Sequence, residues 1–173
     1  ENVEFTIVRE DSKTYGKHYT NRQGEINLEY KLPAGTYLIR ETNTLKGYAL
    51  DTNVRKVALD WGDDQLIEWE NYPLASIRIE KTDAETGDPI SGVKFELFDK
   101  NKESIGTYIT DSKGEIHLDK MFLGDATYYI EETENEGYVV TKGLQTVKTK
   151  WGKTTYVELE NKPIQGKVQI HKT

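Results

Sequence analysis

The chain has 173 residues, of which 31% are charged and 35% hydrophobic, and its net charge is −7. This acidic balance argues against a nucleic-acid-binding protein, which needs a basic face, and no apolar run approaches the roughly 20 residues that cross a bilayer. The chain has no cysteine, so we expect a small fold to rely on some constraint other than disulfides. No signal peptide or anchor is recognisable, and the abrupt start suggests a segment of a longer chain.

Short segments in which apolar and polar residues alternate follow one another along the chain. The clearest, in order, are "SIRIEKTD", "VKFELF", "GTYIT", "EIHL", "TYYIEE" and "TTYVELE", and their period of two predicts β-strands. Turn sequences such as "NRQGE", "ETGDP" and "DSKGE" separate them, and no window has the apolar stripe and caps of a helix. About seven strands in each 90 residues predict an all-β fold of tandem immunoglobulin-like β-sandwiches.

The chain repeats itself at an offset of about 90 residues. Three pairs of segments show this most clearly: "GEI" at 24–26 and 114–116, "WG" at 61–62 and 151–152, and "EWENYP" with "ELENKP". The opening strand of the second copy, "SIRIEKTD", has no counterpart before Glu1. The last residues, "KVQIHKT", repeat its alternation and place Lys172 at the position of Lys81.

These matches predict three parts. Residues 1–73 form a repeat that lacks its first strand, residues 74–163 form a complete repeat, and residues 164–173 are the first strand of a following repeat. In the first part, "QLIEWEN" is then expected to be a strand with an unpaired edge, which favours pairing with another strand.

Three polar residues lie where core-facing rows of side chains end. In "SIRIEKTD", "TYYIEET" and "TYVELEN", the apolar residues of the buried face are followed on that face by Lys81, Glu132 and Asn161, respectively. The plainer interpretation is that each row ends in water at the sandwich rim. The recurrence of Glu41 and Asn71 in the first repeat favours a shared buried site instead, because an unpaired lysine or glutamate is costly in an apolar interior.

Such a site has a defined chemistry. A desolvated lysine becomes a neutral nucleophile and a desolvated carboxyl stays protonated. Attack of Lys81 Nζ on the Asn161 side-chain carbonyl would form an isopeptide bond and expel ammonia, with Glu132 transferring the proton. Glu41 is the equivalent acid of the first repeat, and the candidate residues for a second cross-link are these two: Lys172 and Asn71.

The order "KTD…G…F.L…G…T…G.I…Y.I.ET…GY…V.LEN" resembles the CnaB (SpaA-type, prealbumin-like) repeat of Gram-positive surface adhesins and pilins. The resemblance covers the second repeat and the first apart from its opening strand. It implies an autocatalytic Lys–Asn bond assisted by a buried acid, which by position are Lys81, Asn161 and Glu132. The sequence departs from the family at "ENEGY", where a proline-containing stretch is usual.

The resemblance also implies an extracellular location on the cell wall and a structural stalk or spacer whose partners are neighbouring repeats. Two alternatives remain: an adhesin module that binds a host matrix protein such as collagen, and a transthyretin-like carrier domain. Strand complementation between molecules, in which Lys172 enters the first repeat of another copy head to tail, is a further hypothesis. Its plainer alternative is a loose terminal strand.

Other chemistry has little support in the sequence. His18, His117 and His171 have no spacing typical of a metal site, and neither "DWGDD" nor "DAETGD" matches a calcium loop. There is no phosphate-binding glycine loop, and no Ser/His/Asp arrangement recurs between the repeats. We therefore expect no metal, no cofactor and no multi-turnover catalysis.

Overall fold

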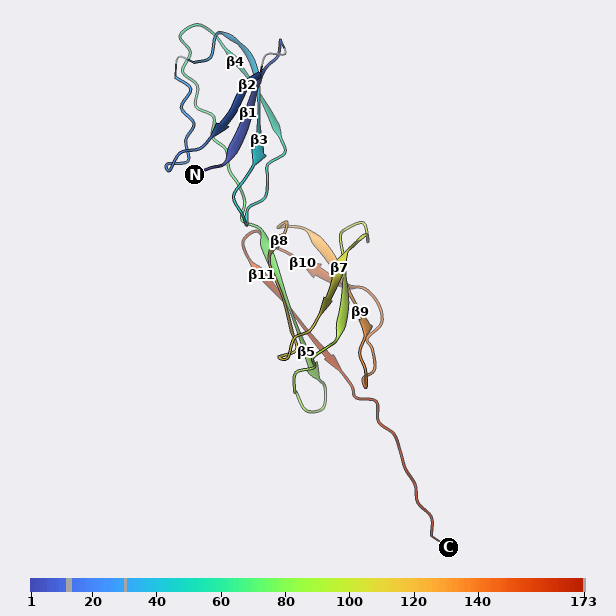
Figure 1. The fold of residues 1–173 in the computed structure, drawn as a ribbon. Helices are drawn as coiled ribbons and strands as arrows, with labels where there is room; N and C mark the ends of the chain where they lie inside the picture. The colour runs from blue at the N-terminus through green and yellow to red at the C-terminus, as the bar shows by residue number, and fades with distance from the viewer. Residues whose placement is uncertain (12–13, 30, 173) are drawn as a thin grey trace. The chain divides into compact units, whose positions relative to one another are not determined.

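A computed structural model describes residues 1–11, 14–29 and 31–172, and in this part of the chain it contains strands but no helix (Figure 1). The prediction of an all-β fold is confirmed. Since the described residues form no helix, none of them forms a membrane-spanning one. Contacts divide the chain into two compact units, Glu1–Pro73 and Leu74–Thr173, which we call the first and the second unit.

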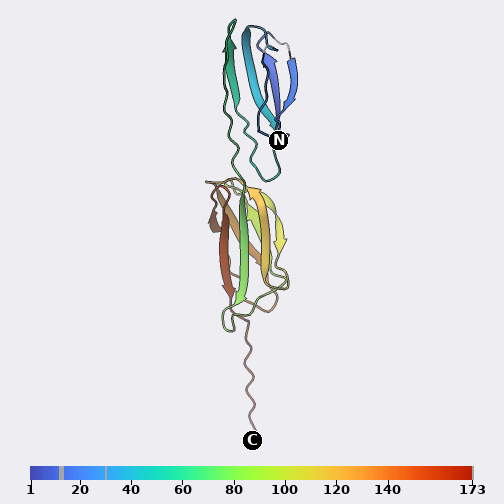
Figure 2. The same ribbon diagram turned by 90° about the vertical axis from the view of Figure 1, so that its left-hand side faces the viewer.

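The second unit is a sandwich of two sheets (Figure 2). Four strands lie in the order β10-β9-β6-β7, and three lie in the order β11-β5-β8. Each of the six alternating segments predicted from the sequence forms one of the strands. The strands are β5 (Ala75–Asp83), β6 (Lys94–Phe98), β7 (Ser104–Ile109), β8 (Glu115–Phe122), β9 (Thr127–Glu134), β10 (Gln145–Lys148) and β11 (Thr154–Asn161).

Strand β5 is the centre of the three-stranded sheet. It pairs antiparallel with β8 and parallel with β11. Its inward residues Ala75, Ile77 and Ile79 are fully buried and pack with Phe95 and Ile130 of the opposite sheet, as the period of two predicts. Strand β5 therefore pairs with two neighbouring strands, and its inward side chains form the middle row of the core.

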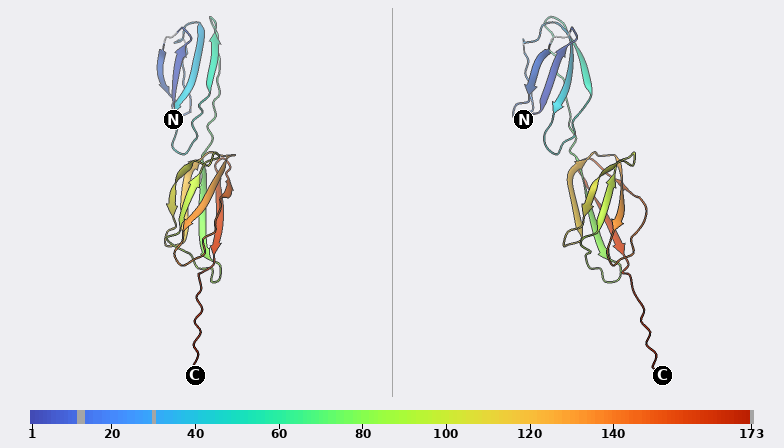
Figure 3. Two further views of the ribbon diagram at one scale, coloured as in Figure 1. Left: turned by 90° about the vertical axis from the view of Figure 1, so that its right-hand side faces the viewer. Right: turned by 45° about the vertical axis from the view of Figure 1, so that its right-hand side comes forward.

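The first unit contains one sheet, in the order β2-β1-β3-β4 (Figure 3). Its strands are β1 (Glu4–Arg9), β2 (Thr14–Tyr19), β3 (Gly35–Asn43) and β4 (Val54–Leu59), and they correspond to β6, β7, β9 and β10. The segments that correspond to β8 and β11, at 25–28 and 65–71, form no strand. The prediction that "QLIEWEN" is a strand is therefore wrong for the described chain, because no described residue of the first unit takes the place of β5.

The core of the first unit is correspondingly thin. Phe5, Ile7 and Tyr37 are its buried hydrophobic residues within the described part of the chain. Two side chains that are buried in the second unit, Ile116 and Leu118, have partly exposed counterparts here, Ile26 and Leu28. Within the described residues, no strand covers Ile26 and Leu28 as β5 covers Ile116 and Leu118 in the second unit.

The residues after β11 leave the second unit as an extended segment (Figure 1). Gln165 still contacts the unit through hydrogen bonds to the Glu85 carboxylate at 2.9 and 3.0 Å. Beyond it, Val168 and Ile170 are 86% and 88% exposed, and residues 164–172 form no strand. An alternating apolar sequence therefore stands unpaired in solvent.

In the first unit, the Glu4 carboxylate accepts hydrogen bonds from Thr42 Oγ1 at 2.6 Å, Tyr19 Oη at 2.8 Å and Lys17 Nζ at 3.2 Å. These bonds, that of Thr42 foremost, lower the pKa of Glu4 from 4.5 to about 2. The stabilisation is therefore complete above pH 4.5 and is lost as the pH falls toward 2.

We expect Thr42→Val to raise the pKa of Glu4, measured by NMR titration of its carboxyl carbon. The variant should be less stable than the parent at neutral pH, and its stability should fall less steeply as the pH is lowered toward 2. Thr133→Val is the matched control, because the equivalent Thr133 donates to the Lys94 carbonyl rather than to a carboxylate. A Glu4 that titrates at its ordinary value in the parent protein would contradict the assignment.

Candidate functional site

The three residues singled out in the second repeat lie on three strands and are all buried. Lys81 is on β5, Glu132 is on β9 of the opposite sheet, and Asn161 ends β11. Their exposed fractions are 1%, 6% and 2%. The rim interpretation would leave such side chains in water, so this burial disfavours it.

Lys81 is a buried amine without a hydrogen-bond partner for Nζ among the described residues. Desolvation lowers the pKa of Lys81, against the attraction of the Glu132 and Glu160 carboxylates. In the parallel pairing of β5 with β11, Lys81 lies opposite Leu159, and Asn161 follows two residues along the same face. An amine whose charged form is disfavoured by burial thus lies on the strand next to the asparagine.

Glu132 and Asn161 are in direct contact across the sandwich, where Asn161 Nδ2 donates a hydrogen bond to Glu132 Oε1. Asn135 Nδ2 also donates to Oε1 at 3.1 Å. Thr141 donates its hydroxyl to Asn161 Oδ1 at 3.2 Å and its backbone N–H to Glu132 Oε2 at 3.4 Å. The amide carbonyl therefore already accepts a bond that draws electron density from its carbon.

Thr141 is a residue of this site that the sequence reasoning missed. It lies in the loop between β9 and β10, outside any alternating row, and its counterpart in the first repeat is Asp51 rather than a threonine. No pattern in the sequence marks it. Only the fold brings this loop to the end of β11.

The first unit contains the corresponding acid and amide. Asn71 Nδ2 donates to Glu41 Oε2 at 2.8 Å and to the Ala49 carbonyl at 2.9 Å, and the Asp51 N–H donates to the same carboxylate oxygen at 2.7 Å. Glu41 is only 3% exposed, and its Oε1 has no partner among the described residues. The structure does not bring Lys172 to this pair, because Lys172 is exposed in the terminal segment.

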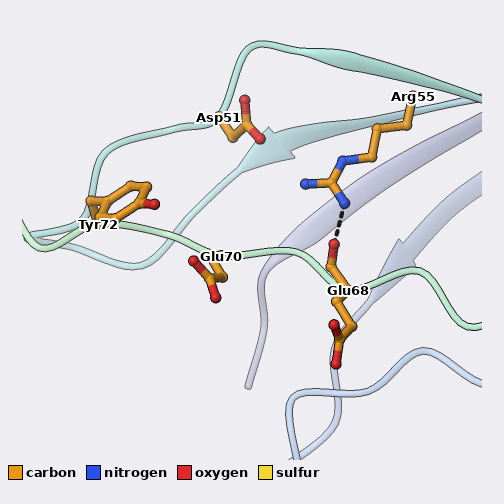
Figure 4. A pocket seen from close by; sticks show the side chains of 5 residues that line it. All are labelled: Asp51, Arg55, Glu68, Glu70 and Tyr72. Atoms are coloured by element: carbon orange, nitrogen blue, oxygen red, sulfur yellow. Dashed lines mark hydrogen bonds between the residues drawn. The ribbon is translucent and has the colours of Figure 1, made fainter.

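Side chains hold residues 65–71 of the first unit in place of a strand pairing. Arg55 donates to the Glu68 carbonyl, as Figure 4 shows, and its guanidinium lies 3.9 Å from the centre of the Trp69 ring. Gln65 Nε2 donates to the Ala58 carbonyl at 2.8 Å. These side-chain contacts therefore hold the segment beside β4. The backbone of residues 65–71 forms no β-ladder with a described strand.

A pocket of about 330 Å³ opens beside this segment (Figure 4). Its lining consists of three carboxylates, one guanidinium and one phenol: Asp51, Glu68, Glu70, Arg55 and Tyr72. The guanidinium is already engaged by a backbone carbonyl. The pocket belongs to the first unit, and it lacks the apolar walls of a small-molecule site.

Within the described ranges, no cluster of three or more histidine and acidic side chains is arranged to hold a metal ion. His117 lies between Arg78 and Glu115, with Nδ1 3.2 Å from Arg78 Nη2 and Nε2 2.6 Å from the Glu115 carboxylate. This histidine is part of a surface hydrogen-bonded group rather than of a ligand set.

Comparison with known families gives one match that spans nearly the whole chain. The family model described as a SpaA prealbumin-like fold domain matches residues 1–73 and 75–163. This pair of matches follows the internal repeat and coincides closely with the two compact units of the structure.

Two related proteins are similar to most of the chain. Serine-aspartate repeat-containing protein F of Staphylococcus epidermidis is 28% identical over 167 residues in one strain, ATCC 12228, and 31% over 142 residues in another sequence. Each alignment covers 82% of this chain, and the chain spans only 10% and 7% of the length of these relatives.

Solved structures share the fold at low identity. The shaft pilin SpaA of Lactobacillus rhamnosus GG superposes with a TM-score of 0.53 at 17% identity, covering 97% of this chain and 89% of the pilin. A streptococcal ancillary pilin gives 0.51 at 22% identity, covering 95% of this chain and 58% of that one. Both support the prealbumin-like fold.

Proposed function

Because the chain belongs to the family of SpaA-type prealbumin-like fold domains, we propose that it is a stalk module of a Gram-positive surface protein, cross-linked internally between Lys81 and Asn161. The family consists of structural domains rather than enzymes, and its relatives are surface proteins and pilins of Gram-positive bacteria. The chain is accordingly an extracellular cell-wall component. The burial of Lys81 without a partner, beside a Glu132–Asn161 contact, is the observation that carries the cross-link.

The reaction is a single transamidation. The Lys81 Nζ lone pair attacks the Asn161 side-chain carbonyl carbon, and the new C–N bond forms. Glu132, which contacts the amide, accepts the proton that Nζ loses and passes it to the asparagine nitrogen. The C–N bond to that nitrogen then breaks, and one ammonia leaves. The Thr141 hydroxyl stabilises the negative charge that develops on the carbonyl oxygen.

The location of this bond suits a load-bearing spacer. Strand β5 opens the second unit and β11 closes it, and the two are parallel neighbours in one sheet. Tension applied to the two ends of the unit would therefore shear these strands along each other. An amide between them carries the load covalently and needs neither thiols nor an oxidising compartment.

Intact-mass measurement of the purified chain tests the proposal. We expect the mass of the second unit to be lower than its sequence mass by one ammonia, and a tandem mass spectrum to show Lys81 joined to Asn161. Lys81→Arg and Glu132→Gln should both restore the sequence mass, whereas Glu131→Gln, a change on the neighbouring outward-facing residue, should not. An unmodified parent mass, or a cross-link that persists in Glu132→Gln, would overturn the mechanism.

A further inference from the structure

We infer that the loop between β9 and β10, residues 135–144, selects the reactive orientation of the Asn161 amide, and that Asn135 in this loop is a positioning residue that acts through Glu132. The inference rests on the proposed function, since it concerns the same cross-linking reaction. It assigns a role to "ENEGY", the segment at which the sequence departs from the usual pattern of the family.

The loop is fixed to the rest of the second unit on both sides of the site. The Val139 N–H donates to the Lys162 carbonyl at 2.9 Å, so the loop is bonded to the chain directly after β11. Tyr138 Oη donates to Asp83 Oδ2 at 3.0 Å, and Asp83 is the last residue of β5. Because β5 carries the lysine and β11 the asparagine of the proposed bond, the loop is held at the ends of both reacting strands.

Among the described residues, three N–H groups donate to the Glu132 carboxylate, and two of them belong to the loop. Oε1 accepts from the amide nitrogens of Asn161 and Asn135, the latter at 3.1 Å, and Oε2 accepts from the Thr141 N–H at 3.4 Å. The terminal torsion of a glutamate is otherwise broad. Asn135 therefore limits the rotation of the carboxylate and keeps Oε1 beside the amide nitrogen, to which Glu132 passes the proton in the proposed reaction.

An asparagine amide can lie in two orientations, which differ in the end that faces the acid. In the structure, Nδ2 of Asn161 faces Glu132, and Oδ1 accepts from the Thr141 hydroxyl at 3.2 Å. The reverse orientation would set the carbonyl oxygen against a carboxylate, which has no hydrogen to donate. It would also move the nitrogen that leaves as ammonia away from the group that passes it a proton. A carboxylate held as an acceptor thus selects the orientation from which the bond can form.

The first unit shows that these loop contacts do not follow from the shared fold. Its acid, Glu41, also accepts a loop N–H, from Asp51 at 2.7 Å, and contacts Asn71 at 2.8 Å. However, Asp51 takes the place of Thr141 and brings no hydroxyl. No side chain of the described ranges takes the place of Asn135, since Oε1 of Glu41 has no partner there. The contacts of Asn135 and of the Thr141 hydroxyl are therefore specific to the second unit.

A time course of bond formation in the full chain tests this inference. The chain is made by cell-free synthesis, samples are quenched with acid, and intact mass gives the fraction that has lost one ammonia. We expect Asn135→Ala to slow the loss by about tenfold, the factor that one hydrogen bond to a charged group supplies. Thr141→Val, which keeps the backbone N–H but removes the hydroxyl, should slow it by roughly 100-fold.

Conservative variants separate the hydrogen bonds from the shape of the side chains. Thr141→Ser retains the hydroxyl and should recover most of the parent rate. Asn135→Asp retains the shape of the side chain but replaces its donor by an acceptor, so it should be at least as slow as Asn135→Ala. Glu136→Ala, on the exposed residue next to Asn135, should react as the parent chain does.

A merely structural role is tested on chains that cannot form the bond. In the Lys81→Met background, we expect Asn135→Ala and Thr141→Val to leave the denaturant midpoint of the second unit nearly unchanged, because Thr141 is exposed and Asn135 only partly buried. Strong destabilisation in this background would overturn the inference, as would loss of ammonia at the parent rate in both single variants. A parent chain that loses no ammonia would instead refute the proposed function, on which the inference rests.

Discussion

Replacing Lys81 by methionine is expected to lower the free energy of unfolding of the second unit by roughly 4 to 5 kcal/mol, by analogy with the loop-closure entropy of a disulfide. The cross-link between residues 81 and 161 closes a loop of 80 residues (161 − 81). Methionine fills the same buried space without placing an amine there, so the change isolates the loss of the bond. A loss of this size is comparable to the whole stability of a small domain.

Denaturant unfolding, with hydrogen exchange of β5 and β11 to separate the two units, measures this effect. Glu132→Gln should be more destabilising than Lys81→Met, because it also prevents the bond but leaves the Lys81 amine buried and unpaired. Lys94→Met is the matched control: this lysine is on the neighbouring sheet in an ion pair with Glu134 at 2.8 Å at the surface, and its loss should cost less than about 1 kcal/mol. A Lys81→Met protein as stable as the parent would show that no bond constrains the unit.

The second large effect is expected at Gly114, in the turn before β8. Its φ is +71°, and a Cβ at this position would lie 2.5 Å from the Lys81 carbonyl oxygen and 3.1 Å from the Ile90 nitrogen. Gly114→Ala therefore combines left-handed backbone strain with a collision against the backbone of β5. We expect a destabilisation of at least about 3 kcal/mol.

Gly24 is the equivalent glycine of the first unit and supplies the control. Its φ is +84°, but a Cβ there would meet nothing within 4 Å, because no β5-like strand lies against the turn. Gly24→Ala should therefore cost only the backbone strain, about 1 kcal/mol. Hydrogen exchange of β8 and of β1 would report the two effects separately. Equal losses at both positions would mean that the collision at Gly114 is relieved by a shift of the turn.

Much of the second unit could be predicted from alternation alone. A period of two identifies both the strand and its buried face, because successive side chains point to opposite sides of a sheet. Lys81, Glu132 and Asn161 were found in this way, since each continues an apolar row. Thr141 could not be found, because loop residues have no such period and their positions depend on how the strands are connected.

The same reasoning failed for "QLIEWEN". Its alternation is as regular as that of "TTYVELE", yet only the latter forms a strand. A strand is completed by hydrogen bonds to a neighbour, and the partner of β11 is β5, about 80 residues earlier in the chain. Local sequence therefore predicts which segments are able to pair, and the presence of the partner decides whether they do.

The amino-acid sequence by itself determined the repeat, the β class and the candidate residues of the proposed cross-link, because these depend on residue type and on a local period. The tertiary structure decided which of them meet. Glu132 and Asn161 come into contact because two sheets pack face to face, and Lys81 is desolvated because β5 lies at the centre of one of them. Glu41 and Asn71 meet in the same way but lack the amine, because no described residue of their unit occupies the position of β5.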